Sequence, residues 1–175
     1  FKESLPAEKR SKTGVWATFR SFGIIVHNRR YMLYVFQLAF AQGILFAYIA
    51  SSPFIIQQHY GFSPFAFSIC FAVNAVAIGV AAALSVKFRR TENGTLTGCV
   101  GMLVFAVLQM AALYSGCGFW TYELLMFALL FMMGLTFTAS TTLAMDCERR
   151  YAGAASALLG ALCFASGGIV SPLVG

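Results

Sequence analysis

Charged residues are scarce in this 175-residue sequence: Asp, Glu, Lys and Arg make up 10% of it, whereas soluble domains carry roughly 25%. Hydrophobic residues make up 59%. This composition excludes an intrinsically disordered chain and argues against a water-soluble enzyme. The net charge is +6, but a nucleic-acid-binding protein needs that charge on a polar surface, which this composition does not provide. The sequence therefore predicts an integral membrane protein with no nucleic-acid partner.

Residues that build catalytic and metal centres are also few. His27 and His59 are the two histidines, and neither has a partner at the spacing of a metal site or a catalytic triad. There is no Gly-rich phosphate-binding loop with a Lys. The five cysteines are unequally spaced and form no Cys-x-x-Cys pair, which favours a role as small packing residues. We therefore expect no enzymatic activity, no cofactor and no metal site.

Long hydrophobic runs are what the sequence has in abundance. A bilayer core about 30 Å thick requires roughly 20 apolar residues of helix. Strands of a β-barrel would instead alternate in polarity over about 10 residues, and these runs are continuous. The predicted fold class is therefore an all-α membrane protein, a polytopic transmembrane helix bundle. Its five predicted spans are residues 31–57, 63–86, 94–116, 119–145 and 152–175.

Glu123 is the one acidic or basic residue inside these predicted spans. It comes only four residues after the start of its span, so we expect its carboxylate to reach the lipid headgroups. Asp146 lies just outside a span and is expected to be interfacial as well. The sequence thus predicts no buried carboxylate pair, and an acid that titrates during proton movement is expected outside this chain.

The twelve Lys and Arg residues all fall on one side of the predicted bundle. Seven precede the first span, three lie between the second and third, and two lie between the fourth and fifth. The other two connections contain none. Short cytoplasmic loops carry such an excess of positive charge. Three segments are therefore expected to be cytoplasmic: the N-terminal segment, residues 87–93 and residues 146–151.

Residues 1–30 differ in character from the rest of the chain. They begin with a polar linker, after which Val15, Phe19, Phe22 and Val26 recur at helical spacing among basic residues. This pattern predicts a basic amphipathic helix on the inner surface of the membrane. The alternative is a flexible, solvated loop.

Uncharged polar residues inside the spans are candidate binding residues, because a polar group in lipid usually faces protein or water. The alternative for each is a hydrogen bond to its own backbone or to a neighbouring helix, and this is favoured for Ser and Thr. The bulky amides of Gln37 and Asn74 fit a water-filled cavity equally well. Three polar residues of the first span, Gln37, Tyr48 and Ser52, share one helix face.

Small residues mark where helices in lipid pack closely. The fifth span carries them at every third or fourth position, and the second span has the series Ala75, Gly79 and Ala83. These stripes predict tight helix contacts or an interface that slides. A Pro near the outer end of the first and of the fifth span predicts a kink, either static or part of a gate. The candidates for packing or gating are Pro53, Gly79, Gly153, Gly160, Gly167 and Pro172.

Four stretches carry a resemblance to a known family. They are the first span from Tyr31 to Gly43, the segment Phe46–Phe54, the Tyr60-Gly-Phe-Ser-Pro64 turn and the stretch that begins Arg149-Arg-Tyr-Ala-Gly153. Together they resemble the Bcr/CflA group of the major facilitator superfamily, the bicyclomycin-resistance type of drug:proton antiporter. The match is specific in the first span and after Asp146, and loose around residues 87–113.

The resemblance implies that the chain is a piece of the C-terminal half of a twelve-helix transporter: the central cytoplasmic loop and helices seven to eleven. The expected partners are then a small-molecule substrate, the lipid bilayer and the missing N-terminal half of the same chain. The expected location is a bacterial inner membrane. The implied substrate cavity lies at the midplane between the two halves. Its candidate lining residues are Gln37, Tyr48, Ser52, Asn74, Thr138 and Thr141.

The function implied by the resemblance is export of drugs or other small amphiphilic molecules in exchange for protons, by alternating access. The proton is the expected coupling ion. Two alternatives remain: a sugar or amino-acid symporter or facilitator of the same fold, and a membrane scaffold that transports nothing.

Overall fold

The computed structural model describes residues 15–88 and 90–174, and in this part of the chain every regular element is a helix. Five of the helical segments are long and apolar enough to cross a membrane. The fold class predicted from the sequence, a partial bundle of five spans, is confirmed. The elements are α1 (Val15–His27), α2 (Arg29–Pro53), the π-helix η2 (Phe54–His59), α3 (Pro64–Ser85), α4 (Thr91–Tyr114), α5 (Phe119–Cys147), the 3₁₀-helix η3 (Arg149–Tyr151) and α6 (Ala152–Val174).

Local sequence signals determine where these helices begin. Asn28 caps α2, and its side chain accepts hydrogen bonds from the backbone N–H groups of Arg30 and Tyr31. Ser63 caps α3 in the same way, with Pro64 at the first helical position, where its missing N–H costs nothing. The short connections between successive spans make neighbouring helices run antiparallel.

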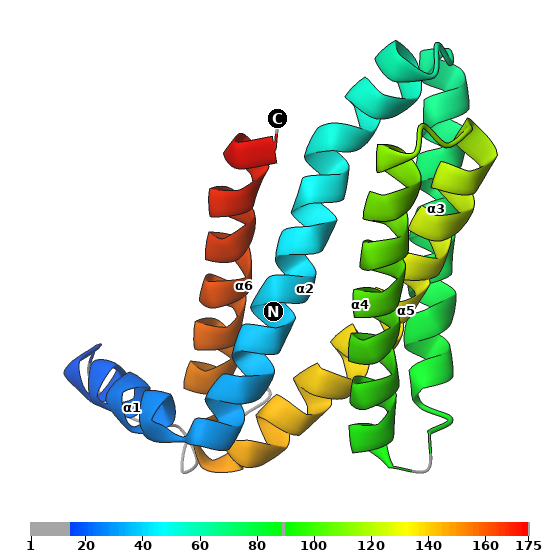
Figure 1. Ribbon diagram of the computed structural model, residues 1–175. Coiled ribbons are helices and arrows are strands. Elements are labelled where there is room, and N and C mark those ends of the chain that lie inside the picture. The colour runs from blue at the N-terminus through cyan, green and yellow to red at the C-terminus, as the bar shows by residue number, and fades with distance from the viewer. Residues whose placement is uncertain (1–14, 89, 175) are drawn as a thin grey trace, which may run out of the picture.

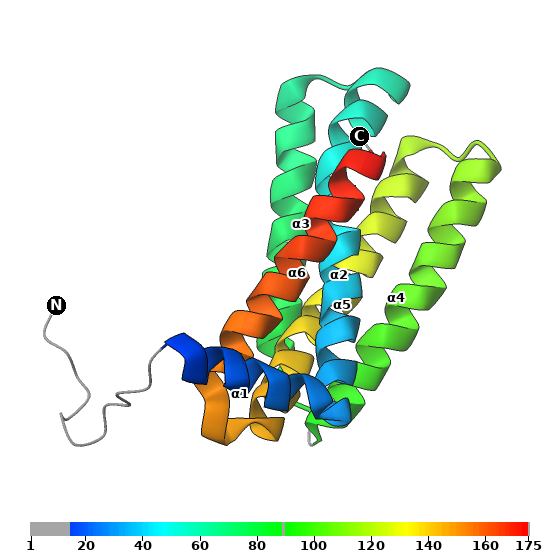
Figure 2. The ribbon, with the colours of Figure 1, turned by 90° about the vertical axis from the view of Figure 1, so that its left-hand side faces the viewer.

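The spans form two groups that α5 connects (Figure 1). The α2 and α6 helices lie side by side, and α3 and α4 each pack along α5 (Figures 1 and 2). The α5 helix runs obliquely and also contacts α2. Two apolar cores join the groups, and each contains residues of both α2 and α5. The first core consists of Ala41, Tyr48, Met102, Leu129, Leu130 and Met133, and the second of Ile25, Tyr31, Val35, Ala144 and Ala155.

The α1 helix lies across one end of the bundle (Figure 2). Its buried face includes Ile25, which is fully buried in the core with Tyr31 and Ala155. Val26, which the sequence placed in the apolar stripe, is 47% exposed. A helix therefore forms where the sequence predicts one, and one of its contacts is to the protein itself. Its position on a membrane surface stays a prediction.

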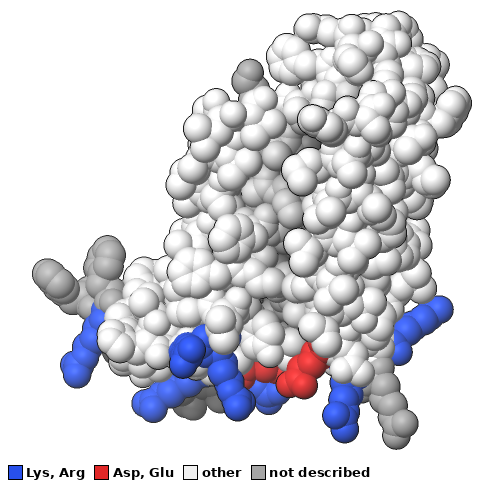
Figure 3. All heavy atoms as spheres, in the orientation of Figure 1, with Lys and Arg blue, Asp and Glu red and all other residues white. Residues whose placement is uncertain are grey.

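Lys and Arg side chains gather at the end of the molecule where α1 lies (Figure 3). The connections at the opposite end, residues 60–63 and 115–118, contain neither residue type. Each of these two connections turns at a glycine with positive φ, Gly61 at 72° and Gly116 at 70°, a conformation that costs glycine little. The charge segregation that the sequence predicts is present in space, while the identity of the cytoplasmic side stays a prediction.

The candidate packing glycines differ in their surroundings. A Cβ added at Gly167 would collide with the ring of Phe46, so α2 and α6 approach closely there. A Cβ at Gly79, Gly153 or Gly160 would meet nothing within 4 Å. Tight packing at these three positions has no partner among the described residues and stays a prediction.

Both candidate kinks lie within helices. Pro53 ends the regular part of α2, and the next six residues form the π-helix η2. Pro removes one backbone hydrogen bond from a helix, and π-helical turns often mark functional sites. Pro172 lies inside α6 and is exposed. A gating role for either residue stays a prediction.

Candidate functional site

Asn74 joins three helices through one nitrogen atom. It is fully buried in the middle of α3. Its Nδ2 donates hydrogen bonds to the Tyr48 hydroxyl on α2 at 3.1 Å and to the Glu123 Oε1 atom on α5 at 2.8 Å. An amide nitrogen has two hydrogens, so both bonds form at once. We call this group of Tyr48, Asn74 and Glu123 the polar cluster.

The structure corrects the predicted position of the Glu123 carboxylate. The sequence predicts that this carboxylate reaches the lipid headgroups. It is instead only partly exposed, and it contacts Asn74 inside the bundle. The reason is its place on α5: position 123 begins a series with Met126, which packs against the first core, and with Leu130 and Met133, which belong to it. The spacing of three, four and three residues is that of one helix face, and this was the signal that sequence reasoning missed.

Several polar atoms around the cluster have no hydrogen-bond partner in the described part of the protein. They are Asn74 Oδ1, Glu123 Oε2, Ser52 Oγ and the Tyr122 hydroxyl, all buried. Ser52 is one helical turn from Tyr48 and fully buried. A buried polar atom without a partner carries a desolvation cost, so these atoms are available to a ligand or to a further part of the protein. Glu123 Oε2 matters most because it belongs to a carboxylate, whose negative charge the two oxygens share when it is ionised.

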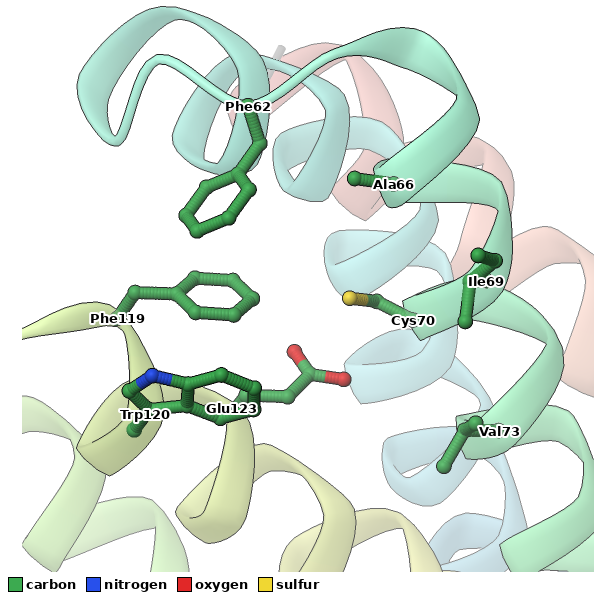
Figure 4. A pocket seen from close by; sticks show the side chains of 8 residues that line it. All are labelled: Phe62, Ala66, Ile69, Cys70, Val73, Phe119, Trp120 and Glu123. Carbon is green, nitrogen blue, oxygen red and sulfur yellow. The ribbon is translucent and has the colours of Figure 1, made fainter.

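A pocket of about 270 Å³ adjoins Glu123 between α3 and the start of α5. We call it the aromatic pocket. Figure 4 shows the carboxylate pointing toward the space between the rings of Phe119 and Trp120 and the α3 side chains. The Phe62 and Phe119 ring centroids are 4.2 Å apart, and those of Phe119 and Trp120 are 5.4 Å apart. The remaining lining residues are Ala66, Ile69, Cys70 and Val73.

Tyr60 supports the aromatic pocket from outside the spans. Its hydroxyl donates to the Cys117 carbonyl oxygen at 3.0 Å, and its ring lies 5.6 Å from that of Phe119. Burial, with the neighbouring Cys117, raises the pKa of Tyr60 to about 12. The phenol therefore stays neutral at physiological pH and acts as a hydrogen-bond donor that joins the two connections at this end of the bundle.

The six predicted lining residues do not form one group. Tyr48 and Asn74 are hydrogen-bonded to each other, and Ser52 is close to them along α2. Gln37 is eleven positions before Tyr48, about 16 Å of helix rise. Thr141 donates its hydroxyl to the backbone of Phe137 at 2.7 Å, the alternative that the sequence favours for Thr.

Gln37 lies by a second pocket of about 420 Å³, between α2 and α4. Both polar atoms of its amide are buried without a partner among the described residues. Thr138 is partly exposed, and its carbonyl oxygen accepts from the Thr142 hydroxyl at 3.0 Å. A binding role for Gln37, Thr138 and Thr141 stays a prediction. In the described residues no group of three or more His, Cys, Asp or Glu side chains could hold a metal ion.

Five apolar spans with a buried hydrogen-bonded carboxylate define a class, the multi-pass helical membrane proteins in which an intramembrane ionisable residue marks a functional site. The sequence profile of the Major Facilitator Superfamily matches residues 2–172. The chain belongs to this superfamily. It is 36% identical over 178 aligned positions to the uncharacterized MFS-type transporter YdgK of Bacillus subtilis strain 168.

That alignment covers 99% of this chain and 44% of YdgK. The chain therefore spans less than half the length of this relative. No solved structure matches the chain. The superfamily comprises secondary transporters rather than enzymes, while the Bcr/CflA subgroup is a finer assignment than these similarities carry.

Proposed function

We propose that the chain is part of a secondary transporter of the Bcr/CflA type, which exports drugs or other small amphiphilic molecules by proton antiport. The observation that carries the proposal is the polar cluster. A carboxylate held by Asn74 between three spans is expensive in an apolar bundle, and proton-coupled transporters use such groups. Membership of a superfamily of secondary transporters and the resemblance of the first span support the same reading.

The position of Glu123 changes which part of the transporter is proposed to carry the titrating acid. From the sequence, the titrating acid is predicted outside this chain. Because Glu123 is hydrogen-bonded to Asn74 inside the bundle, this chain contains its own candidate for the acid that binds and releases a proton. A carboxylate accepts a proton when its charge has no counter-ion and releases it when water or a cation stabilises the charge. That exchange is the chemistry that an antiporter requires.

The mechanism we propose is rocking of this half against the remainder of the transporter around the substrate cavity. Tyr48, Ser52 and Asn74 contribute polar, uncharged contacts, and Gln37, Thr138 and Thr141 remain candidate lining residues. Buried Lys or Arg is absent from the described spans, which argues against anionic substrates such as sugar phosphates. The proposed location is a bacterial inner membrane, with the basic end of Figure 3 in the cytoplasm.

The test is uptake of fluorescent drugs, one cationic and one neutral, into inside-out vesicles that contain the full-length protein. We expect uptake that requires a proton gradient and stops when an uncoupler is added. Gln37→Leu and Asn74→Leu should lower it. Equal uptake with and without the gradient, for several drugs, would favour a facilitator. No uptake of any compound by correctly inserted protein would favour a scaffold.

A further inference from the structure

We propose that the aromatic pocket with Glu123 is a binding site for an organic monovalent cation, which competes there with a proton. The binding claim stands on the geometry of the site, and only the claim that this cation is a transported substrate rests on the proposed function. The site lies on α3 and α5, apart from Gln37 and the threonines of the predicted lining.

The charge of the ligand follows from the charge of the site. Within the described residues Glu123 has no ion pair: its one hydrogen-bond partner is the neutral amide of Asn74. The Lys and Arg side chains that the structure describes lie at the other end of the molecule (Figure 3). Asn74 holds Oε1, which leaves Oε2 buried and without a partner. An ionised carboxylate in these surroundings attracts a cation strongly because little water screens it.

The organic nature of the ligand follows from the walls of the pocket. Three aromatic side chains, Phe62, Phe119 and Trp120, lie beside the carboxylate, and aromatic faces attract weakly hydrated organic cations. The opposite wall is apolar and comes from α3. A hydrated Ca²⁺ or Mg²⁺ ion needs six or more oxygen ligands, and this pocket offers one carboxylate. Its volume, about 270 Å³, suits a small quaternary ammonium with an aromatic substituent.

Competition with protons follows from the groups that face Glu123. They are Tyr48 on α2, Cys70 on α3, and Tyr122 on its own helix, which in turn contacts Tyr60. Phenols and thiols ordinarily titrate well above pH 7, so the carboxylate is the group of this set that gains a proton as the pH falls below 7. Protonation removes the charge that holds the cation. Cation affinity should therefore fall as pH falls, and rise again on return to neutral pH.

The experiment is equilibrium dialysis of radiolabelled benzyltrimethylammonium against the purified full-length protein. Glu123→Gln keeps the shape of the side chain and an oxygen that can accept from Asn74, so it should fold. We expect its affinity to fall by roughly tenfold or more and to become independent of pH. Glu92→Gln is the matched control, because Glu92 lies in the first turn of α4. It should bind like the unmodified protein.

A second variant tests the aromatic wall. Trp120 is 80% exposed, so Trp120→Leu should leave folding intact and weaken cation binding about two- to fivefold.

Neopentylbenzene, the uncharged isostere of the probe, should not compete. Binding that is the same in Glu123→Gln as in the unmodified protein, or full competition by neopentylbenzene, would overturn the proposal. Transport of drugs with no Glu123-dependent cation binding would leave the proposed function in place and sink this inference. Glu123-dependent cation binding without drug transport would support this inference and contradict the proposed function.

Discussion

The Nδ2 atom of Asn74 lies 2.8 Å from Oε1 of Glu123 and connects the middle of α3 to the beginning of α5. The same nitrogen donates to the Tyr48 hydroxyl, so a single amide fixes the position of the carboxylate relative to two other spans. Because both hydrogens of the amide nitrogen are used, this side chain orients Glu123 through Oε1 and leaves Oε2 without a hydrogen-bond partner in the described part of the protein.

Asn74→Leu should lower benzyltrimethylammonium binding and drug uptake by roughly tenfold or more, because a hydrogen bond to a charged group contributes about 1.5–3 kcal/mol. Tyr48→Phe, which removes one neutral acceptor of the same amide, should have a smaller effect, about fivefold. The two variants are compared by dialysis and by vesicle uptake, at equal amounts of monodisperse protein. If Tyr48→Phe is more damaging than Asn74→Leu, Asn74 is not the residue that positions Glu123.

Tyr31→Phe should destabilise the protein by about 1 kcal/mol or more. The Tyr31 hydroxyl is fully buried and donates to the Ala155 carbonyl oxygen at 2.6 Å, which joins α2 to α6. Loss of the hydroxyl leaves that carbonyl without this donor. The measurement is the thermal unfolding midpoint in detergent. Tyr114→Phe is the control, because Tyr114 is 96% exposed, and an equal shift in both variants would refute the interhelical role of Tyr31.

Gly134→Ala should separate α5 from α3. A Cβ at this position would lie 2.5 Å from the carbonyl oxygen of Ile78 and close to Ala81, and a backbone carbonyl cannot move aside as a flexible side chain can. Overpacking of this kind typically costs about 1–3 kcal/mol. We expect a lower unfolding midpoint and a smaller yield of folded protein. Gly153→Ala, where the added atom meets nothing within 4 Å, should be neutral or slightly stabilising.

The membrane orientation has its own test in cysteine labelling. In a cysteine-free variant of the full-length protein, a cysteine placed at His59 should react in intact cells with a maleimide that cannot cross the membrane. A cysteine at Asn93 should react only after the cells are opened. These positions lie at opposite ends of the bundle, and the Lys and Arg side chains are at the end of Asn93. The opposite labelling pattern would reverse the assigned cytoplasmic side.

The sequence predicted the spans well because length and hydropathy suffice for that purpose. The predicted span 63–86, for example, corresponds to α3 at Pro64–Ser85. The predicted location of the Glu123 carboxylate was wrong, because its closeness to the start of a span was given more weight than the helix face that it shares with Met126 and Leu130. The helical wheel also placed Gln37 and Tyr48 on one face of α2. In the structure Gln37 shares a pocket with residues of α4, whereas Tyr48 is hydrogen-bonded to Asn74 of α3. A helical wheel gives the direction of a side chain and not the neighbour that covers it.

The central claim is that Glu123 exchanges a proton for a cationic substrate. It is tested most directly in proteoliposomes of the full-length protein with a pH indicator trapped inside and a gradient of benzyltrimethylammonium across the membrane. We predict that cation efflux drives protons inward, and that Glu123→Gln abolishes proton movement while Glu92→Gln does not. Cation transport without any change in internal pH, or proton movement that is undiminished in Glu123→Gln, would contradict the claim.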